Sequence, residues 1–113
     1  MRGPLEEKTP SQPVERLFAF ALRSRILVVG RDQLARSKGK LHFVLITRDL
    51  SENSRSEILS KFARYPVIQL YTQPELEDLF RIRGAKVIGF RKSNLARSIY
   101  AELKEYRINS PRN

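Results

Sequence analysis

The clearest hydrophobic pattern in the chain is the segment LHFVLI, from Leu41 to Ile46, in which His42 is the only polar residue. A short apolar run of this kind is typical of a strand buried on both faces of a sheet, and it is too short to span a membrane. The polar residues that follow end the strand. Ser51 can then cap a helix, because its hydroxyl accepts a hydrogen bond from the first helical turn. The pattern therefore predicts a strand at 41–47 that leads into a helix at 51–64.

Apolar residues spaced three and four apart, and short β-branched runs, predict the other elements of the chain. The remaining predicted helices are 14–24, a short helix within 30–36, a helix that follows residues 72–75, and a helix capped by Ser93 that reaches Leu103. The remaining predicted strands are 26–29, 67–71 and 86–90. Residues 72–75, TQPE, have the form of a capping box, with threonine at the cap and glutamate three positions later. Helices and strands thus alternate, which predicts the α/β class with helices on both faces of a sheet.

Length and composition predict a single domain with a modest hydrophobic core, since the chain has 113 residues of which 41% are apolar. Residues 1–12 are expected to form a flexible leader, residues 13–107 the domain, and residues 108–113 a frayed tail. The chain has no cysteine, which excludes disulfides and zinc-thiolate sites, and its charged, proline-rich start lacks the pattern of a signal peptide. We therefore expect a cytoplasmic protein with no membrane association.

Basic residues are concentrated in two segments of the chain, and the net charge is +10. Residues 16–48 contain eight Lys or Arg residues and one acid, Asp32, whereas residues 81–98 contain six Lys or Arg residues and no acid. The segment between them, 49–78, carries six acids and three bases. A basic surface attracts a polyanion, so this distribution favours binding to nucleic acid over a merely solvated surface.

The polar residues show no pattern typical of a catalytic or metal-binding site. His42 is the only histidine and is expected to be a half-buried strand residue, since no second titrating group is apparent beside it. Asp49, at the end of a strand, is expected to shape the turn before the next helix. Gly39-Lys40 lacks the upstream glycine and the following hydroxyl of a phosphate-binding P-loop. No enzymatic activity, cofactor or metal is therefore expected.

Three segments carry a resemblance to a known family. VLITRDLSENSRSEILSKF, at 44–62, resembles the strand, turn and third helix of the kink-turn RNA-binding ribosomal protein family, which includes L-seven-Ae, L-thirty-e and S-twelve-e. ILVVG before GRDQLAR resembles the family's short strand and glycine, and PVIQLYTQPELEDLF resembles its third strand and fourth helix. The chain is similar to a divergent member of bacterial type. The resemblance implies a three-layer α/β/α sandwich with a four-stranded mixed sheet and five helices.

The resemblance also implies an RNA site built from two places, the turn and helix that begin at Gly30 and the loop before the last strand. Gly30 would let the backbone approach a phosphate, and Arg31 and Arg36 could pair with phosphates or guanine edges. Gln33 stands where the family carries Glu or Gln against the sheared G·A pairs of a kink-turn, and an amide both donates and accepts at base edges. Ile82 would either pack on an unstacked base or belong to the core of its loop. The implied site is Gly30, Arg31, Asp32, Gln33, Arg36, Lys38, Arg81, Ile82, Arg83 and Gly84.

Two positions depart from the family's pattern. Asp32-Gln33 stands in place of the Asn-Glu pair of many members, and Glu77 stands where a glycine is usual, beside the RNA-facing end of the fourth helix. The sequence thus predicts a protein that binds kink-turn or other structured RNA, ribosomal or regulatory, through a basic face. Two alternatives stay open: a protein-interaction module that docks through the acidic segment 49–78, and an accessory substrate-binding subunit for an RNA-modifying enzyme. A ribosome or a protein is then a further partner.

Overall fold

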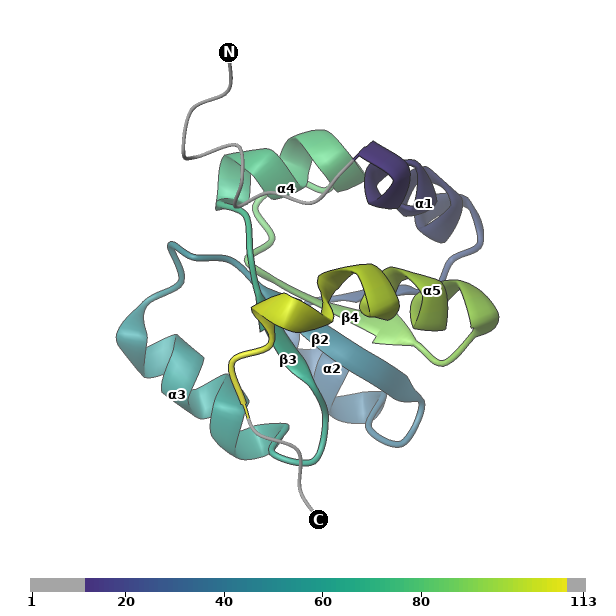
Figure 1. The fold of residues 1–113 in the computed structure, drawn as a ribbon. Coiled ribbons are helices and arrows are strands. Elements are labelled where there is room, and N and C mark those ends of the chain that lie inside the picture. Colours follow the sequence, from purple (N-terminus) through teal and green to yellow (C-terminus); the bar gives the residue numbers. More distant parts are fainter. Residues whose placement is uncertain (1–11, 110–113) are drawn as a thin grey trace.

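A sheet between two layers of helices makes up the described chain, which in this computed structural model comprises residues 12–109 (Figure 1). Helices α1 (Gln12–Arg23), α4 (Gln73–Phe80) and α5 (Asn94–Leu103) cover one face of the sheet, and α2 (Arg31–Arg36) and α3 (Glu52–Lys61) cover the other. This is the predicted α/β/α arrangement, with the predicted order of elements. Residues 1–11 of the predicted leader and 110–113 of the predicted tail lie outside the described residues.

The sheet has its strands in the order β1-β4-β2-β3, where β1 is Leu27–Val29, β2 is Leu41–Ile46, β3 is Val67–Gln69 and β4 is Val87–Arg91. β4 runs antiparallel to both β1 and β2, whereas β2 and β3 are parallel, so the sheet is mixed as predicted. Because β2 is paired on both sides and covered on both faces, its residues from Phe43 to Ile46 are completely buried. The central position of β2 explains why its sequence is a continuous apolar run.

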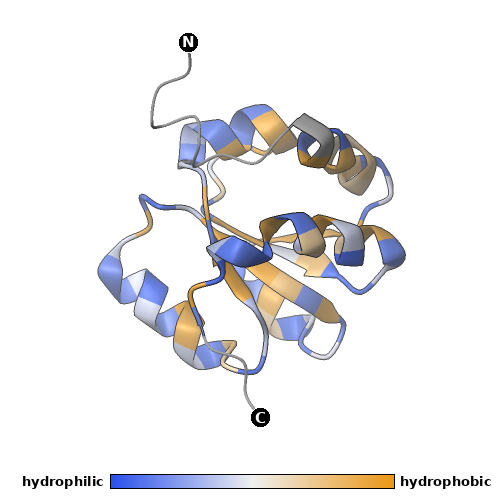
Figure 2. Ribbon diagram, viewed as in Figure 1, coloured by the Kyte–Doolittle hydropathy of each residue, from blue (hydrophilic) through white to orange (hydrophobic). Residues whose placement is uncertain are grey.

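Two hydrophobic cores attach the helix layers to the sheet. In the first core, the rings of Phe18 in α1 and Phe80 in α4 lie 4.5 Å apart, and Phe80 contacts Phe90 of β4 edge-on at 5.9 Å. The second core joins α2 and α3 to the other face through Leu34, Ile58 and Phe62 among others. In Figure 2 the strands are mainly apolar and the helices have polar and apolar sides, as this two-core arrangement requires.

The helix starts predicted from the sequence are confirmed by their hydrogen bonds. The Ser51 hydroxyl accepts from the Ser54 amide at 3.2 Å, and the Ser93 hydroxyl accepts from the Ala96 amide at 2.9 Å. The capping box at the start of α4 is complete, because the Thr72 amide donates to the Glu75 carboxylate at 2.8 Å while the Glu75 amide donates to the Thr72 hydroxyl at 3.4 Å. Local sequence therefore decides where these helices begin.

The ends of the elements differ by a few residues from the prediction. α3 ends at Lys61 rather than at residue 64, and β3 ends at Gln69 rather than at residue 71. The early end of β3 has a local cause, since Tyr71 has the left-handed backbone angle φ of 69° and cannot continue a strand. The Asp49 carboxylate, predicted to shape the turn before α3, also accepts from the Gln73 amide at 3.1 Å and so binds the start of α4.

The last described residues lie along the edge strand β3. The Ile108 amide donates to the Val67 carbonyl at 2.9 Å, after a short 3-10 helix, η2 (Lys104–Tyr106). The Asn109 side chain accepts from the Val67 amide at 2.9 Å and donates to the Tyr65 carbonyl at 2.7 Å. Two residues of the segment predicted to fray are thus hydrogen-bonded to the sheet edge. Within residues 12–109, no helix combines the length and the apolar character that a membrane span requires.

Candidate nucleic-acid interface

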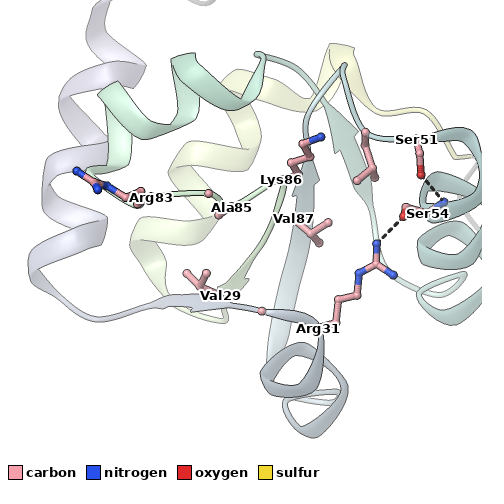
Figure 3. Close-up of a pocket in the computed structure, with 11 residues that line it drawn as sticks. Val29, Arg31, Ser51, Ser54, Arg83, Ala85, Lys86 and Val87 are labelled. Atoms are coloured by element: carbon pink, nitrogen blue, oxygen red, sulfur yellow. Dashed lines mark hydrogen bonds between the residues drawn. The ribbon is translucent and has the colours of Figure 1, made fainter.

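A surface groove of about 380 Å³ lies where three connections of the fold meet, and we call it the basic groove (Figure 3). It is lined by residues 29–31 at the β1–α2 turn, by residues 50, 51 and 54 at the start of α3, and by residues 83–87 before and within β4. β4 lies between β1 and β2 and runs antiparallel to both. The end of β1, the end of β2 and the start of β4 therefore lie at the same end of the sheet, where the three connections meet. The basic groove thus joins the two sequence segments in which basic residues are concentrated.

Gly30 forms the turn between β1 and α2. Its backbone has φ of 95° and ψ of 144°, a conformation that residues with a Cβ rarely adopt. A Cβ at this position would meet no atom within 4 Å, so the glycine is required by the backbone angle and not by crowding. The space beside the Gly30 backbone is therefore open, and the approach of a phosphate to it stays a prediction.

α2 is held against β4 by a close approach at Gly89. A Cβ on Gly89 would lie 2.4 Å from the Leu34 Cδ2 atom and 3.0 Å from the Leu41 Cδ2 atom, which is closer than side chains can pack. Leu34 is fully buried at this contact. The small residue on β4 therefore fixes how closely α2, with its exposed residues, sits on the sheet.

Arg31 is bound within the protein, although the sequence suggested a residue that would pair with phosphates. Its Nη1 lies 2.7 Å from the Glu57 Oε1 atom, and its Nη2 donates to the Ser54 hydroxyl at 2.5 Å. The ion pair is about half exposed, with side-chain exposures of 48% and 46%. Arg31 thus links α2 to α3 at the wall of the basic groove, and its guanidinium does not pair with the neighbouring Asp32.

The loop before β4 supplies the other wall of the basic groove. α4 ends at Arg81, which has a left-handed φ of 57°, and the Gly84 amide then donates to the Glu77 Oε2 atom at 2.8 Å. Glu77, for which the resemblance implies a glycine, therefore stabilises this loop from α4 through its hydrogen bond with the Gly84 amide. In Figure 3 the Arg83 side chain extends away from Arg31 and from the other labelled residues.

Ile82 is half-buried and packs against the first hydrophobic core. Of the two interpretations that the sequence allowed for Ile82, the structure favours a core residue of the loop over a residue that packs on a base. Burying Ile82 anchors the loop, while the neighbouring Arg83 and Gly84 stay exposed.

The basic groove includes only part of the implied site. Gly30, Arg31, Arg83 and Gly84 line it. Asp32, Gln33, Arg36, Lys38 and Arg81 are exposed and lie outside its lining. The Lys38 ammonium group lies 5.1 Å from the centre of the Phe62 ring and belongs to a separate surface with Lys61 and Arg64.

Three polar lining residues were missed as site residues from the sequence: Lys86, Ser51 and Ser54. Lys86 was assigned only to a strand, although it belongs to the acid-free segment 81–98 and could have been included on that ground. Ser51 and Ser54 were interpreted as structural residues of a helix start, and they also border the groove. Their position beside Arg83 and Lys86 depends on strand order, which the residues themselves do not reveal.

The side chains around the basic groove are suited to bind an anion. Arg83 and Lys86 supply positive charge, and Ser51 and Ser54 supply hydroxyl groups. Among residues 12–109, no three His, Cys, Asp or Glu side chains are grouped so that they could hold a metal ion. The histidine of the chain lies elsewhere, half-buried on β2, where burial, and then the charges of Arg97 and Lys92, lower its pKa below the ordinary value of 6.5.

Solved structures share the fold of this chain at low sequence identity. A protein with unknown function from Bacillus halodurans matches with a TM-score of 0.75 and 20% identity, over 83% of this chain and 99% of that one. A 15.5 kD RNA-binding protein from Giardia lamblia matches with a TM-score of 0.62 and 14% identity, over 94% of this chain and 90% of that one. No protein-family model and no curated protein matches the sequence. The chain therefore has the same α/β fold as these two proteins over most of its length.

Proposed function

We propose that the chain binds structured RNA, with the basic groove and the exposed side of α2 as the contact surface. The observation that carries this proposal is the meeting of two basic segments at one groove. Arg31 comes from the first segment, and Arg83 and Lys86 come from the second. The strand order brings all three residues to the same end of the sheet. A concave surface that carries positive charge complements a phosphate backbone.

Each basic residue would act on RNA in its own way. Arg83 presents a planar guanidinium that can bind a phosphate with two parallel hydrogen bonds, and Lys86 presents a compact positive charge. Arg31 is held by Glu57 and Ser54, so it would contribute only the guanidinium N–H groups that these two residues do not use. Gly30 leaves the backbone open beside these side chains. Together they would neutralise phosphates and position the RNA, while base contacts would come from α2.

The fold supports the same proposal. The neighbour from Giardia lamblia is an RNA-binding protein and shares the architecture over 94% of this chain. Within that architecture we further propose recognition of a kink-turn by Gln33 and Arg36, which are both exposed on α2 and free to reach base edges. Asp32, also exposed on α2, opposes the close approach of a phosphate, so the base contacts of Gln33 and Arg36 have to outweigh this repulsion. This role requires no catalysis, cofactor or metal.

The arrangement of the acidic segment makes protein docking through it less favourable than RNA binding. Its residues are divided between α3 and α4, which lie on opposite faces of the sheet. Most of its carboxylates already have partners inside the chain, for example Glu57 with Arg31 and Glu77 with the Gly84 amide. The acids of segment 49–78 therefore do not form one continuous docking face within the described residues.

A binding titration tests the proposal. The chain is titrated against a kink-turn RNA, and against the same RNA with its G·A pairs replaced, at two salt concentrations. We expect tighter binding to the kink-turn at both salts, and a decrease of log affinity with log salt of about 0.7 to 0.9 per phosphate neutralised. Arg83→Ala combined with Lys86→Ala should weaken binding roughly tenfold or more and make this salt dependence shallower by about two phosphates.

The matched control is Arg16→Ala combined with Lys104→Ala, which removes the same charge from exposed positions outside the basic groove. This control should change affinity by less than about threefold, because distant exposed charges are largely screened. Equal losses in the two double variants would show that the net charge and not the groove binds RNA. Equal affinity for the two RNAs, together with unchanged affinity after Gln33→Ala and Arg36→Ala, would contradict the kink-turn part of the proposal.

A further inference from the structure

A second cavity lies in the helix layer formed by α1, α4 and α5, and we call it the acidic cavity. It has a volume of about 200 Å³ and is lined by Glu15, Tyr71, Glu75, Asp78 and Leu79. None of these residues lines the basic groove. Three of the five carry carboxylates, so the cavity concentrates negative charge on a chain with a net charge of +10.

Tyr71 gives the acidic cavity an unsatisfied polar group. Tyr71 is only 2% exposed, and its hydroxyl has no hydrogen-bond partner among the described residues. A buried hydroxyl without a partner is unfavourable, so native proteins rarely retain one unless a ligand or a function uses it. Since Tyr71 lines the cavity, a molecule bound there could supply the missing partner.

The backbone places the Tyr71 side chain firmly at this point. Its φ of 69° is unusual for a residue with a Cβ, and its carbonyl accepts from the Arg48 amide at 2.7 Å. The Tyr71 ring meets the Phe18 ring edge-on, with centroids 6.1 Å apart. These contacts hold the Tyr71 backbone against the segment that follows β2 and the Tyr71 ring against α1, so the side chain has a fixed position beside the cavity that it lines.

The charges around the Tyr71 hydroxyl disfavour any further negative charge. Burial raises the pKa of Tyr71, and the carboxylates of Glu15 and Glu75 are among the groups that raise it further. The same negative field favours a positively charged group at this point. Glu75 is already held by the Thr72 amide at 2.8 Å and lies 3.6 Å from the Arg48 Nη2 atom, whereas Glu15 and Asp78 have no ion-pair partner within residues 12–109.

We propose that the acidic cavity binds an organic cation, an alkyl guanidinium or alkyl ammonium group. The Tyr71 hydroxyl would accept a hydrogen bond from the cation, Glu15 and Asp78 would pair with its charge, and Leu79 would pack against its methylene groups. A metal ion fits less well, because no three carboxylates among residues 12–109 are grouped at ligating distances. This site is independent of the proposed RNA contact, with which it shares no residue.

The proposal is tested by titrating the full chain with n-butylguanidinium and with its neutral counterpart n-butylurea, at low salt, while recording backbone amide NMR shifts. We expect saturable shifts at Glu15, Tyr71 and residues 75–79 with the cation, and no saturable shifts with the urea. Tyr71→Phe should keep the fold, because the lost hydroxyl has no partner in the protein. This variant should bind the cation about tenfold more weakly, since a buried hydrogen bond to a charged group is lost.

Asp78→Asn should weaken cation binding about fivefold, as expected for an exposed charge pair. The matched control is Glu102→Gln, an exposed acid on α5 that does not line the cavity, and it should leave the affinity unchanged. Equal binding of the urea, unchanged binding by Tyr71→Phe, or an equal loss in Glu102→Gln would each overturn the proposal.

Two further ligands identify the source of the cation. Tighter binding of agmatine than of acetyl-arginine-methylamide would support a free polyamine-like ligand. The reverse order would support an arginine side chain presented by a protein partner. RNA affinity is measured in parallel with Asp78→Asn, which we expect to bind RNA as the unmodified chain does. Failure of the cation site therefore leaves the RNA proposal intact, and the failure of RNA binding leaves this site intact.

Discussion

His42 lies half-buried on β2, with its ring edge-on to the Tyr100 ring at 5.3 Å and to the Phe43 ring at 5.8 Å. Its Nε2 atom has no hydrogen-bond partner among the described residues. Burial lowers the pKa of His42, and the positive charges of Arg97 and Lys92 lower it further. The folded protein therefore holds His42 neutral at a pH where the unfolded chain already begins to take up a proton.

We expect the free energy of unfolding to decrease as the pH falls below about 6.5, the ordinary histidine value. In this range the unfolded state binds more protons than the folded state, so the contribution of His42 is present above pH 6.5 and is lost below it. Denaturant unfolding between pH 5.5 and 7.5 measures the effect. His42→Gln should make stability nearly independent of pH there, because this chain has a single histidine. A decline of the same size in both proteins would contradict the assignment.

At the scale of elements, the loop between α4 and β4 depends on Glu77. The Glu77 carboxylate accepts from the Gly84 amide at 2.8 Å, and Ile82 anchors the same loop in the first core. Arg83 of this loop lies between these two attachment points. Glu77 thus stabilises the conformation in which the loop presents the charge of Arg83.

Glu77→Ala should free the loop without unfolding the domain. We expect a stability loss of about 0.5–1.5 kcal/mol, together with faster hydrogen exchange of the Gly84 amide and weaker RNA binding. Hydrogen exchange followed by NMR measures the loop directly. Glu102→Ala, an exposed acid on another helix, serves as the control and should leave Gly84 exchange unchanged. Unchanged Gly84 exchange in Glu77→Ala would show that the carboxylate does not hold the loop.

The starts of the helices could be predicted from the sequence more accurately than the ends of the helices and strands. The helix starts at Ser51, Thr72 and Ser93 were predicted correctly because capping depends on residues three positions apart. The ends were predicted less well. β3 stops early because Tyr71 has a left-handed backbone, a conformation that its sequence pattern did not indicate.

At the scale of the whole molecule, the last described residues form hydrogen bonds with the edge strand β3 of the sheet. Asn109 accepts from the Val67 amide and donates to the Tyr65 carbonyl, and its Oδ1 atom also accepts from the Arg107 Nε atom at 3.1 Å. These contacts cover the outer edge of β3, which would otherwise expose backbone groups. They connect α5 and η2 to the start of β3.

Asn109→Ala should lower the free energy of unfolding by about 1–3 kcal/mol, because two backbone groups of the partly buried sheet edge lose their partner. Denaturant unfolding monitored by circular dichroism measures this change. Asn53→Ala, an exposed position on α3, is the matched control and should be neutral or slightly stabilising, since alanine favours a helix. If the two variants are equally stable, the contacts of Asn109 do not contribute to folding.

The sequence by itself determined the class and order of the fold. The buried run at β2, the helical spacing elsewhere and the caps are local patterns, and they correctly predicted the α/β class with helices on both faces of a sheet, while the mixed sheet was implied by the family resemblance. The two basic segments were also visible as local concentrations of charge. These features depend on residues a few positions apart, so they can be identified without knowing which strands are neighbours.

Only the tertiary structure decided which side chains share a site. Strand order brought Arg83 and Lys86 to the groove that Arg31 also lines, and the packing of α2 and α3 on one face of the sheet gave Arg31 the partner Glu57 that limits its role. The acidic cavity could not be predicted either, because Glu15 and Asp78 meet Tyr71 only when α1 packs on α4. The physical reason is the same in both cases. Charge pairing and burial depend on distances in space, and residues far apart in sequence acquire those distances only when the helices pack on the sheet.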